Sequence, residues 1–136
     1  GLTCDLITGF PGETDEDQAA TLEFIRRCAF SDMHIFPYSR RPGTPADKMP
    51  DQCSRAVKEA RAHEAKAAAV EMKQNFLRAS VGQVLPVLFE TGEGGYFTGH
   101  SDTYVLVKAR GEALRGKTLD VRITGVDGGE LTGEII

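Results

Sequence analysis

Residues 9–14, with the sequence GFPGET, combine residue types that could contact a ligand. Glycine lets a backbone approach a ligand closely, and proline stiffens a turn. The helix that follows would offer free N–H groups to an anion or a carboxylate. A glycine-rich turn is a weak signal by itself, so these residues alone favour a plain strand-to-helix turn.

A second candidate is the stretch HIFPYSRRPGTPA at residues 34–46. Arg40 and Arg41 are adjacent guanidinium groups close to Tyr38, a combination suited to phosphate and base contacts. A solvated charged loop is the competing interpretation, and the residues alone leave both open. We expect His34, inside an apolar run, to be a satisfied core histidine rather than a ligand or a base.

A third candidate combines aromatic and basic residues near the end of the chain. Such combinations bind single-stranded or looped RNA through stacking and phosphate contacts. Side chains alternate between the two faces of a strand, so Tyr96 and Phe97 cannot both point inward, and some of these aromatics belong to a core. The RNA-binding candidates, with the two loop arginines included, are Arg40, Arg41, Lys73, Arg78, Tyr96, Phe97, His100, Tyr104, Lys108 and Arg110.

Composition excludes several other kinds of chemistry. The chain has no paired carboxylates, no Ser-His-Asp order and no metal-spaced His/Cys cluster, which gives hydrolase functions little support. Its three cysteines lie far apart and indicate reduced thiols. A net charge of -4 means that nucleic-acid binding must depend on a local basic patch. With no apolar run long enough for a membrane span or a signal peptide, we expect a cytoplasmic protein without a membrane partner.

Residues 1–39 predict one β-α-β unit. Apolar residues near 2–9 and 33–37 indicate parallel strands covered on both faces. Thr14, three residues before Asp17, resembles a capping box and predicts a helix through Arg27. Two strands do not make a sheet, so we expect the chain to be the carboxy-terminal part of a longer protein.

A proline-rich loop and a long helix follow. Four prolines between residues 37 and 53 exclude continuous helix, and the loop begins where parallel strands end, the usual place for ligands in α/β folds. Residues 51–79 contain no glycine or proline and predict a long helix. Its expected packing stripe is Val57, Ala60, Ala67, Val70, Phe76 and Leu77.

Past residue 80 the chain alternates short β-prone runs with glycine-rich turns. Five strands are predicted, near 83–89, 96–100, 103–109, 118–126 and 130–136. About sixty residues of this kind suit a small, closed or nearly closed barrel. The fold class is therefore α/β plus all-β.

Three stretches together, residues 5–25, residues 34–52 and the terminal barrel, resemble the tRNA methylthiotransferases, a radical S-adenosylmethionine family that ends in a TRAM domain. The resemblance implies the carboxy-terminal part of a partial (β/α) barrel at 1–50, a connecting helix at 51–73 and a five-stranded, OB-like TRAM barrel at 74–136. Residues 34–46 are most similar to the branch that acts on N6-threonylcarbamoyladenosine beside the tRNA anticodon. The branch that acts on isopentenyladenosine shares much of this loop.

The resemblance also implies cofactors and a partner. The intact protein would use S-adenosylmethionine and two iron–sulfur clusters, and its partner would be the tRNA anticodon stem-loop. The chain lacks the family's Cys-x-x-x-Cys-x-x-Cys motif, so we expect it to bind no cluster and to be inactive alone. The positions that match the family's cofactor-binding strands are Ile7, Gly9, Phe36, Pro37 and Tyr38.

Two further interpretations remain. The chain could be a stand-alone RNA-binding module whose β-α-β part is a scaffold, or an adaptor that docks a protein through its α/β edge. We also expect the strands at 2–9 and 33–37, with unpaired edges, to form the unstable part or to pair with a second copy as a homodimer or a swapped dimer.

Overall fold

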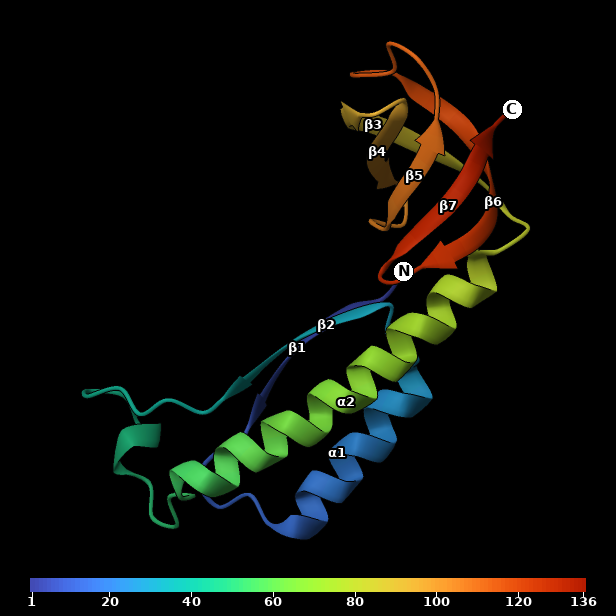
Figure 1. Ribbon diagram of the computed structural model, residues 1–136. Coiled ribbons are helices and arrows are strands. Elements are labelled where there is room, and N and C mark those ends of the chain that lie inside the picture. The colour runs from blue at the N-terminus through green and yellow to red at the C-terminus, as the bar shows by residue number, and fades with distance from the viewer. The chain divides into compact units, whose positions relative to one another are not determined.

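A computed structural model describes residues 1–136 (Figure 1). The chain divides into two compact units, Leu2–Lys73 and Gln74–Ile136, and each is described by itself. Neither of the two long helices is apolar enough over a sufficient length to cross a membrane.

The first unit contains the β-α-β arrangement that the sequence predicts. Strand β1 (Thr3–Thr8) pairs in parallel with strand β2 (Asp32–Pro37), and helix α1 (Asp15–Cys28) connects them. Helix α1 begins at the predicted capping box, because the Thr14 hydroxyl accepts from the Asp17 N–H and the Asp17 carboxylate accepts from the Thr14 N–H.

The sheet of the first unit is covered on one face only, which corrects the expectation of two covered faces. Ile35 is buried against Ala62 and Ala65 of helix α2 (Arg55–Ser80). The alternate residues Ile7 and Phe36 remain 55% and 53% exposed. Since side chains alternate along a strand and the unit's apolar clusters lie on the helix side, the opposite face of β1 and β2 stays open.

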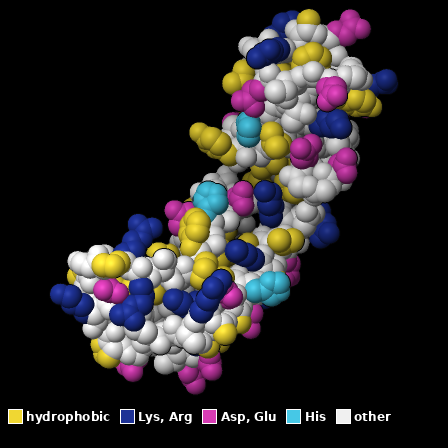
Figure 2. All heavy atoms as spheres, turned by 60° about the vertical axis from the view of Figure 1, so that its left-hand side comes forward, with side chains coloured by type: hydrophobic (Ala, Val, Ile, Leu, Met, Phe, Trp, Pro, Cys, Tyr) yellow, Lys and Arg dark blue, Asp and Glu magenta, His cyan; other side chains and the backbone are white.

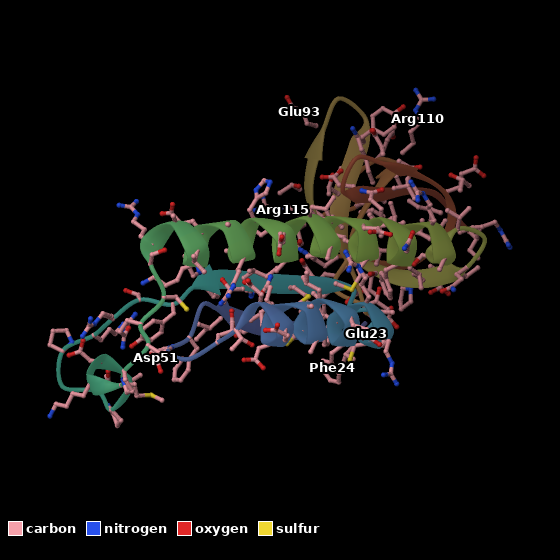
Figure 3. The ribbon with its side chains drawn as sticks, turned by 90° about the horizontal axis from the view of Figure 1, so that it is seen from below. Glu23, Phe24, Asp51, Glu93, Arg110 and Arg115 are labelled. Carbon is pink, nitrogen blue, oxygen red and sulfur yellow. The ribbon has the colours of Figure 1, made fainter.

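The buried face of α2 differs from the predicted stripe. In the first unit this helix buries Ala62, Ala65, Ala68 and Met72. Four of the predicted stripe residues are exposed, because alanines occur all around this helix and the pattern fits more than one face. These are Val57, Ala60, Ala67 and Val70. On α1, Phe24 is also exposed (Figure 3).

The long helix begins at Arg55 rather than at residue 51. Asp51 has a φ of 58°, in the left-handed region, which excludes it from a right-handed helix. The Ser54 hydroxyl then accepts from the Val57 N–H, as an N-cap residue does. Before it, residues 38–54 form the expected loop, interrupted by a 3₁₀ turn, η1 (Ala46–Lys48).

The second unit is a closed five-stranded barrel, which confirms the five-stranded all-β prediction. Strand order around the barrel is β3-β4-β5-β7-β6. All neighbours are antiparallel except the parallel pair of β5 and β7. The strands are β3 (Val84–Glu93), β4 (Tyr96–Ser101), β5 (Leu106–Arg110), β6 (Thr118–Asp127) and β7 (Glu130–Ile135).

Alternate residues of these strands fill the barrel. Val87, Phe89, Val107 and Val121 are fully buried there, with Leu77 from the last turns of α2. Strand β5 begins at Leu106 rather than at residue 103, since Tyr104 takes a φ of 62° in the turn after β4. The residues that alternate with the buried ones point outward on the barrel surface.

Candidate functional site

Three predicted RNA-binding side chains meet on the outer surface of β4 and β5. Tyr96 and Arg110 are register partners in this antiparallel pair. Lys108 Nζ lies 5.2 Å and Arg110 Cζ 5.6 Å from the centre of the Tyr96 ring. These are cation–π distances, and 41% of the tyrosine is exposed. The three residues form what we call the Tyr96 cluster.

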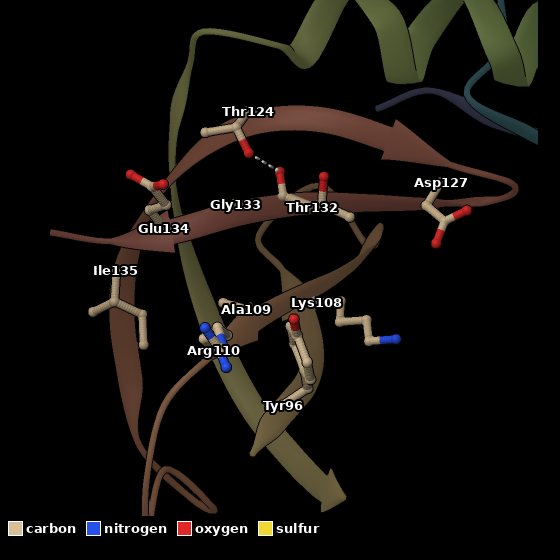
Figure 4. Close-up of a pocket in the computed structure, with 10 residues that line it drawn as sticks. All are labelled: Tyr96, Lys108, Ala109, Arg110, Thr124, Asp127, Thr132, Gly133, Glu134 and Ile135. Atoms are coloured by element: carbon tan, nitrogen blue, oxygen red, sulfur yellow. Dashed lines mark hydrogen bonds between the residues drawn. The ribbon is translucent and has the colours of Figure 1, made fainter. Parts of the chain in front are cut away.

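A hollow of about 700 Å³ opens beside the Tyr96 cluster (Figure 4). Strands β6 and β7 provide its other wall, where Thr132 is the register partner of Lys108. The carboxylates of Asp127 and Glu134 also line it. Sequence reasoning missed these two acidic residues, although the alternation of polar and apolar residues along residues 130–135 places Glu134 on an outer face.

Phe97 is corrected from an RNA-binding residue to a core residue. It packs against the buried barrel cluster, and its ring occupies the space where a side chain on Gly92 would lie. The reason is the strand period of two, since Tyr96 points outward and the next side chain must point inward.

The other two aromatic candidates of the barrel lie outside the Tyr96 cluster. His100 Nδ1 lies 2.7 Å from Glu90 Oε2, so this imidazole already has an anionic partner. Tyr104 is 88% exposed in the turn that follows the far end of β4.

The two helix-borne candidates divide between the units. Lys73 belongs to the first unit, where its Nζ lies 3.4 Å from Asp32 Oδ2. Arg78 belongs to the second unit and is exposed. Their contact with RNA stays a prediction.

The glycine-rich turn after β1 satisfies its own backbone. Gly9 N donates to Glu13 Oε1 at 3.0 Å, and Gly12 N donates to the Asp51 carbonyl at 2.9 Å. The helix that follows carries three carboxylates in its first turn, at residues 15–17, and these would repel an anion. The turn is therefore a poor anion site, in agreement with the plain strand-to-helix interpretation.

Arg61 of α2 holds this turn in place, and sequence reasoning did not single it out. Its guanidinium lies 2.9 Å from Glu13 Oε1 and 2.9 Å from Asp15 Oδ1, and it also donates to the Glu13 carbonyl. The hydrogen bond to Asp15, together with that to Glu13, raises the pKa of Arg61 above its ordinary value. The turn is thus anchored to α2 by a permanent positive charge.

The five predicted cofactor positions gather at the carboxyl ends of β1 and β2. Ile7 and Phe36 are register partners on the open face of the sheet. Gly9 follows β1 with a φ of 71°, and a side chain there would overlap Lys58. Pro37 ends β2.

Tyr38 comes next and packs edge-on against Phe10, with ring centres 5.4 Å apart. Lys58 Nζ lies 5.5 Å from the centre of the Tyr38 ring. The Tyr38 hydroxyl is shielded from solvent and has no hydrogen-bond partner. An unpaired phenol at the edge where α/β folds bind ligands is consistent with a polar group of a ligand as its partner.

The two loop arginines play different parts. Arg40 Nε lies 2.9 Å from Asp47 Oδ1, and the same guanidinium donates to the Asp47 carbonyl, so Arg40 braces the loop. Arg41 is exposed and takes part in no ion pair. Lys and Arg side chains gather at this end of the first unit (Figure 2). Arg41 is thus the freer of the two for a phosphate contact.

His34 corrects the expectation of a core histidine. It lies on the open face of the sheet, where its Nδ1 is 3.1 Å from Asp5 Oδ1, and both side chains are 77% exposed. The reason is again alternation, because the buried residue of this stretch is the next one, Ile35.

Comparison with known proteins decides the family. No protein-family model matches the chain. Threonylcarbamoyladenosine tRNA methylthiotransferase MtaB of Bacillus subtilis is 38% identical over 128 residues, which cover 90% of this chain and 28% of that protein. The tRNA-2-methylthio-N(6)-dimethylallyladenosine synthases of Mycobacteroides abscessus and Maricaulis maris are 41% and 39% identical, over 99% and 98% of this chain and 26% and 30% of those proteins.

This chain belongs to the tRNA methylthiotransferase family. The resemblance noted in the sequence is thereby confirmed. The chain spans 26–30% of the length of these curated relatives.

The cysteines of the chain are three free thiols, each partly buried. Cys4 and Cys28 pack against the apolar cluster around Ile25 and Phe30, whereas Cys53 lies next to Phe10 and Glu13 carbonyls. No three His, Cys, Asp or Glu side chains come together as a metal site requires. The cysteines therefore do not supply a ligand set that fits an iron–sulfur cluster.

Proposed function

We propose that this chain is part of a tRNA methylthiotransferase in which the barrel is the TRAM domain and holds the tRNA. The Tyr96 cluster carries this proposal, because it combines an exposed aromatic face with two cations. In small OB-type barrels the second and third strands, here β4 and β5, carry the oligonucleotide-binding face. Bases stack on such aromatics, and cations beside them contact phosphates.

The first unit would contribute to the S-adenosylmethionine site of the whole protein, as part of its partial (β/α) barrel. The adjacent, exposed side chains of Ile7 and Phe36 fit the flat apolar face of an adenine. The Tyr38 hydroxyl would supply a hydrogen bond nearby. When bound with the clusters, S-adenosylmethionine would supply the radical and the methyl group of methylthiolation, while this chain's residues bind and orient it.

The substrate that we propose is N6-threonylcarbamoyladenosine next to the anticodon, because residues 34–46 are most similar to that branch. The alternative is a dimethylallyladenosine, since relatives of both kinds match this chain at comparable identity. Mass spectrometry of tRNA nucleosides from a strain without the gene distinguishes the two. We expect the 2-methylthio derivative of threonylcarbamoyladenosine to disappear, and loss of the dimethylallyl derivative instead would overturn the substrate assignment.

RNA binding by the barrel is tested with residues 1–136 and an anticodon stem-loop, titrated at several salt concentrations. If Lys108 and Arg110 contact phosphates, replacing both by Gln weakens binding and flattens the slope of log K against log salt by about one to two. If Tyr96 stacks on a base, Tyr96→Ala costs about 1–3 kcal/mol with little change of that slope.

The matched control replaces Arg26 and Arg27, both exposed on α1, by Gln, which changes the net charge equally. This control variant should bind RNA like the parent. Equal affinity for the parent and for both barrel variants would leave the barrel without an RNA role.

A further inference from the structure

The hollow beside the Tyr96 cluster has two chemically different walls. Tyr96, Lys108 and Arg110 form one wall, on β4 and β5. Asp127 and Glu134 lie on β6 and β7, and both are exposed. Neither carboxylate takes part in an ion pair, although Glu134 is the register partner of Arg122. The hollow is therefore lined by an aromatic ring and by two free carboxylates, and these lie at opposite ends of its β6–β7 wall (Figure 4).

The acidic wall restricts what can lie against it. A phosphate there would be repelled, and an ionised carboxylate can only accept hydrogen bonds. The part of a ligand that faces Asp127 and Glu134 must therefore present N–H or O–H donors. Phosphates belong on the other wall, next to Lys108 and Arg110.

A nucleobase meets both requirements at once. Its flat face can stack on Tyr96, while its edge points toward one of the carboxylates and its phosphates lie near the cations. A volume of about 700 Å³ falls within the range of small-ligand sites. Among the four bases, guanine presents two adjacent donors, N1–H and N2–H₂, that match the two oxygens of one carboxylate.

We propose that this hollow binds an unpaired guanine of the RNA, with Tyr96 stacking on the base and one of its two carboxylates, that of Asp127 or that of Glu134, accepting hydrogen bonds from the donor edge. This inference rests on the proposed RNA-binding role of the barrel and adds base selectivity to it. Adenine and cytosine present one amino group beside an acceptor nitrogen, which a carboxylate would repel. Uracil presents a single N–H between two carbonyls.

The test uses residues 1–136 and six-residue oligouridylates that carry one central guanine, inosine or adenine, titrated by fluorescence anisotropy. A bidentate contact to a base is worth about tenfold in affinity. We expect the guanine oligomer to bind about tenfold more tightly than the adenine oligomer. The inosine oligomer, which lacks the N2 amino group, should fall between them.

Variants assign the effect to the acidic wall. Asp127→Asn or Glu134→Gln, whichever removes the accepting carboxylate, should reduce the guanine preference. The adenine oligomer should bind both variants as well as it binds the parent or better, because a negative charge has been removed. The control is Glu93→Gln, which removes a carboxylate from a separate cavity that Tyr96 also lines. Glu93→Gln should keep the full guanine preference.

The outcomes separate the two proposals. Salt-sensitive binding that is equal for guanine, inosine and adenine would overturn the guanine site and leave the RNA-binding role intact. A guanine preference that survives in both acidic variants would overturn the assignment to Asp127 and Glu134. No binding of any oligomer or of the anticodon stem-loop would overturn the RNA-binding role, and the guanine site with it.

Discussion

Nη1 of Arg61 lies 2.9 Å from Oε1 of Glu13, and only 9% and 15% of these two side chains are exposed. The same carboxylate oxygen accepts the backbone N–H of Gly9. Arg61 of α2 thus holds the glycine-rich turn that follows β1. Ile7, one of the predicted cofactor positions, lies just before this turn.

Loss of this ion pair should destabilise the first unit. Arg61→Met leaves the Glu13 carboxylate without its cation in a shielded place, which costs about 2–3 kcal/mol of unfolding free energy. Urea denaturation followed by circular dichroism measures the change. Arg55→Met removes an exposed ion pair with Glu59 on the same helix and should have no measurable effect. Equal stability of Arg61→Met and the parent would refute the structural role.

The capping box predicts a pH dependence. Hydrogen bonds from the backbone and the side chain of Thr14 hold the pKa of Asp17 below its ordinary value. A lowered pKa contributes stability that is present above the ordinary value, near pH 4, and is lost as the pH falls through the folded value. The parent should therefore be more stable than Asp17→Asn at pH 7, and the difference should vanish in acid. Glu16→Gln, in the same helical turn, is the control, and a difference that does not change with pH would contradict the prediction.

A glycine of β4 should be irreplaceable. A Cβ on Gly99 would overlap the Leu88 carbonyl and approach Phe89 Cα, which are backbone atoms of the neighbouring strand. Gly99→Ala should cost about 3 kcal/mol of barrel stability, since strands cannot move apart without losing their hydrogen bonds. Gly129→Ala, where a Cβ meets nothing within 4 Å, should be tolerated. Thermal unfolding of both variants measures the difference. Similar melting temperatures for Gly99→Ala and Gly129→Ala would contradict the close contact of β4 with β3 at Gly99.

Two adjacent aromatics should respond oppositely to truncation. Phe97→Ala removes a ring that packs on the barrel core and should lower stability by about 2 kcal/mol. Tyr96→Ala removes an outward ring and should reduce RNA affinity with little loss of stability. Parallel denaturation and RNA titration of the two variants provide the comparison. If a folded Phe97→Ala variant lost RNA affinity while Tyr96→Ala kept it, the assignment of Tyr96 as the RNA-binding ring and Phe97 as the core ring would be reversed.

Because one face of β1 and β2 is open, the first unit should either self-associate or exchange its amide hydrogens faster than the barrel does. Ile7 and Phe36 expose neighbouring apolar surface there, and each strand has one unpaired edge. Light scattering should detect a dimer of residues 1–136, and Phe36→Thr should weaken it. Val70→Thr, on the exposed side of α2, is the control. A monomer with equally slow amide exchange in both units would rule this out.

Local sequence was enough to predict the elements themselves. The capping pair Thr14 and Asp17, the apolar runs of β1 and β2 and the glycine-rich turns of the barrel depend on neighbours a few residues apart, so their effects are visible in the order of residues. The candidate residues Tyr96, Lys108 and Arg110 were also found this way, because a short hairpin brings its two strands together.

Which face of each helix and strand is buried was decided only by the tertiary structure. Alternation shows that Tyr96 and Phe97 point in opposite directions, but the choice of the outward ring depends on the register of β4 between β3 and β5. The alanine-rich helix could bury several faces, and packing against the sheet selected one. Asp127 and Glu134 reach the Tyr96 hollow because β7 pairs in parallel with β5 when the barrel closes. Such pairings join residues far apart in the chain, and their free energy comes from burial of the whole core rather than from local preference.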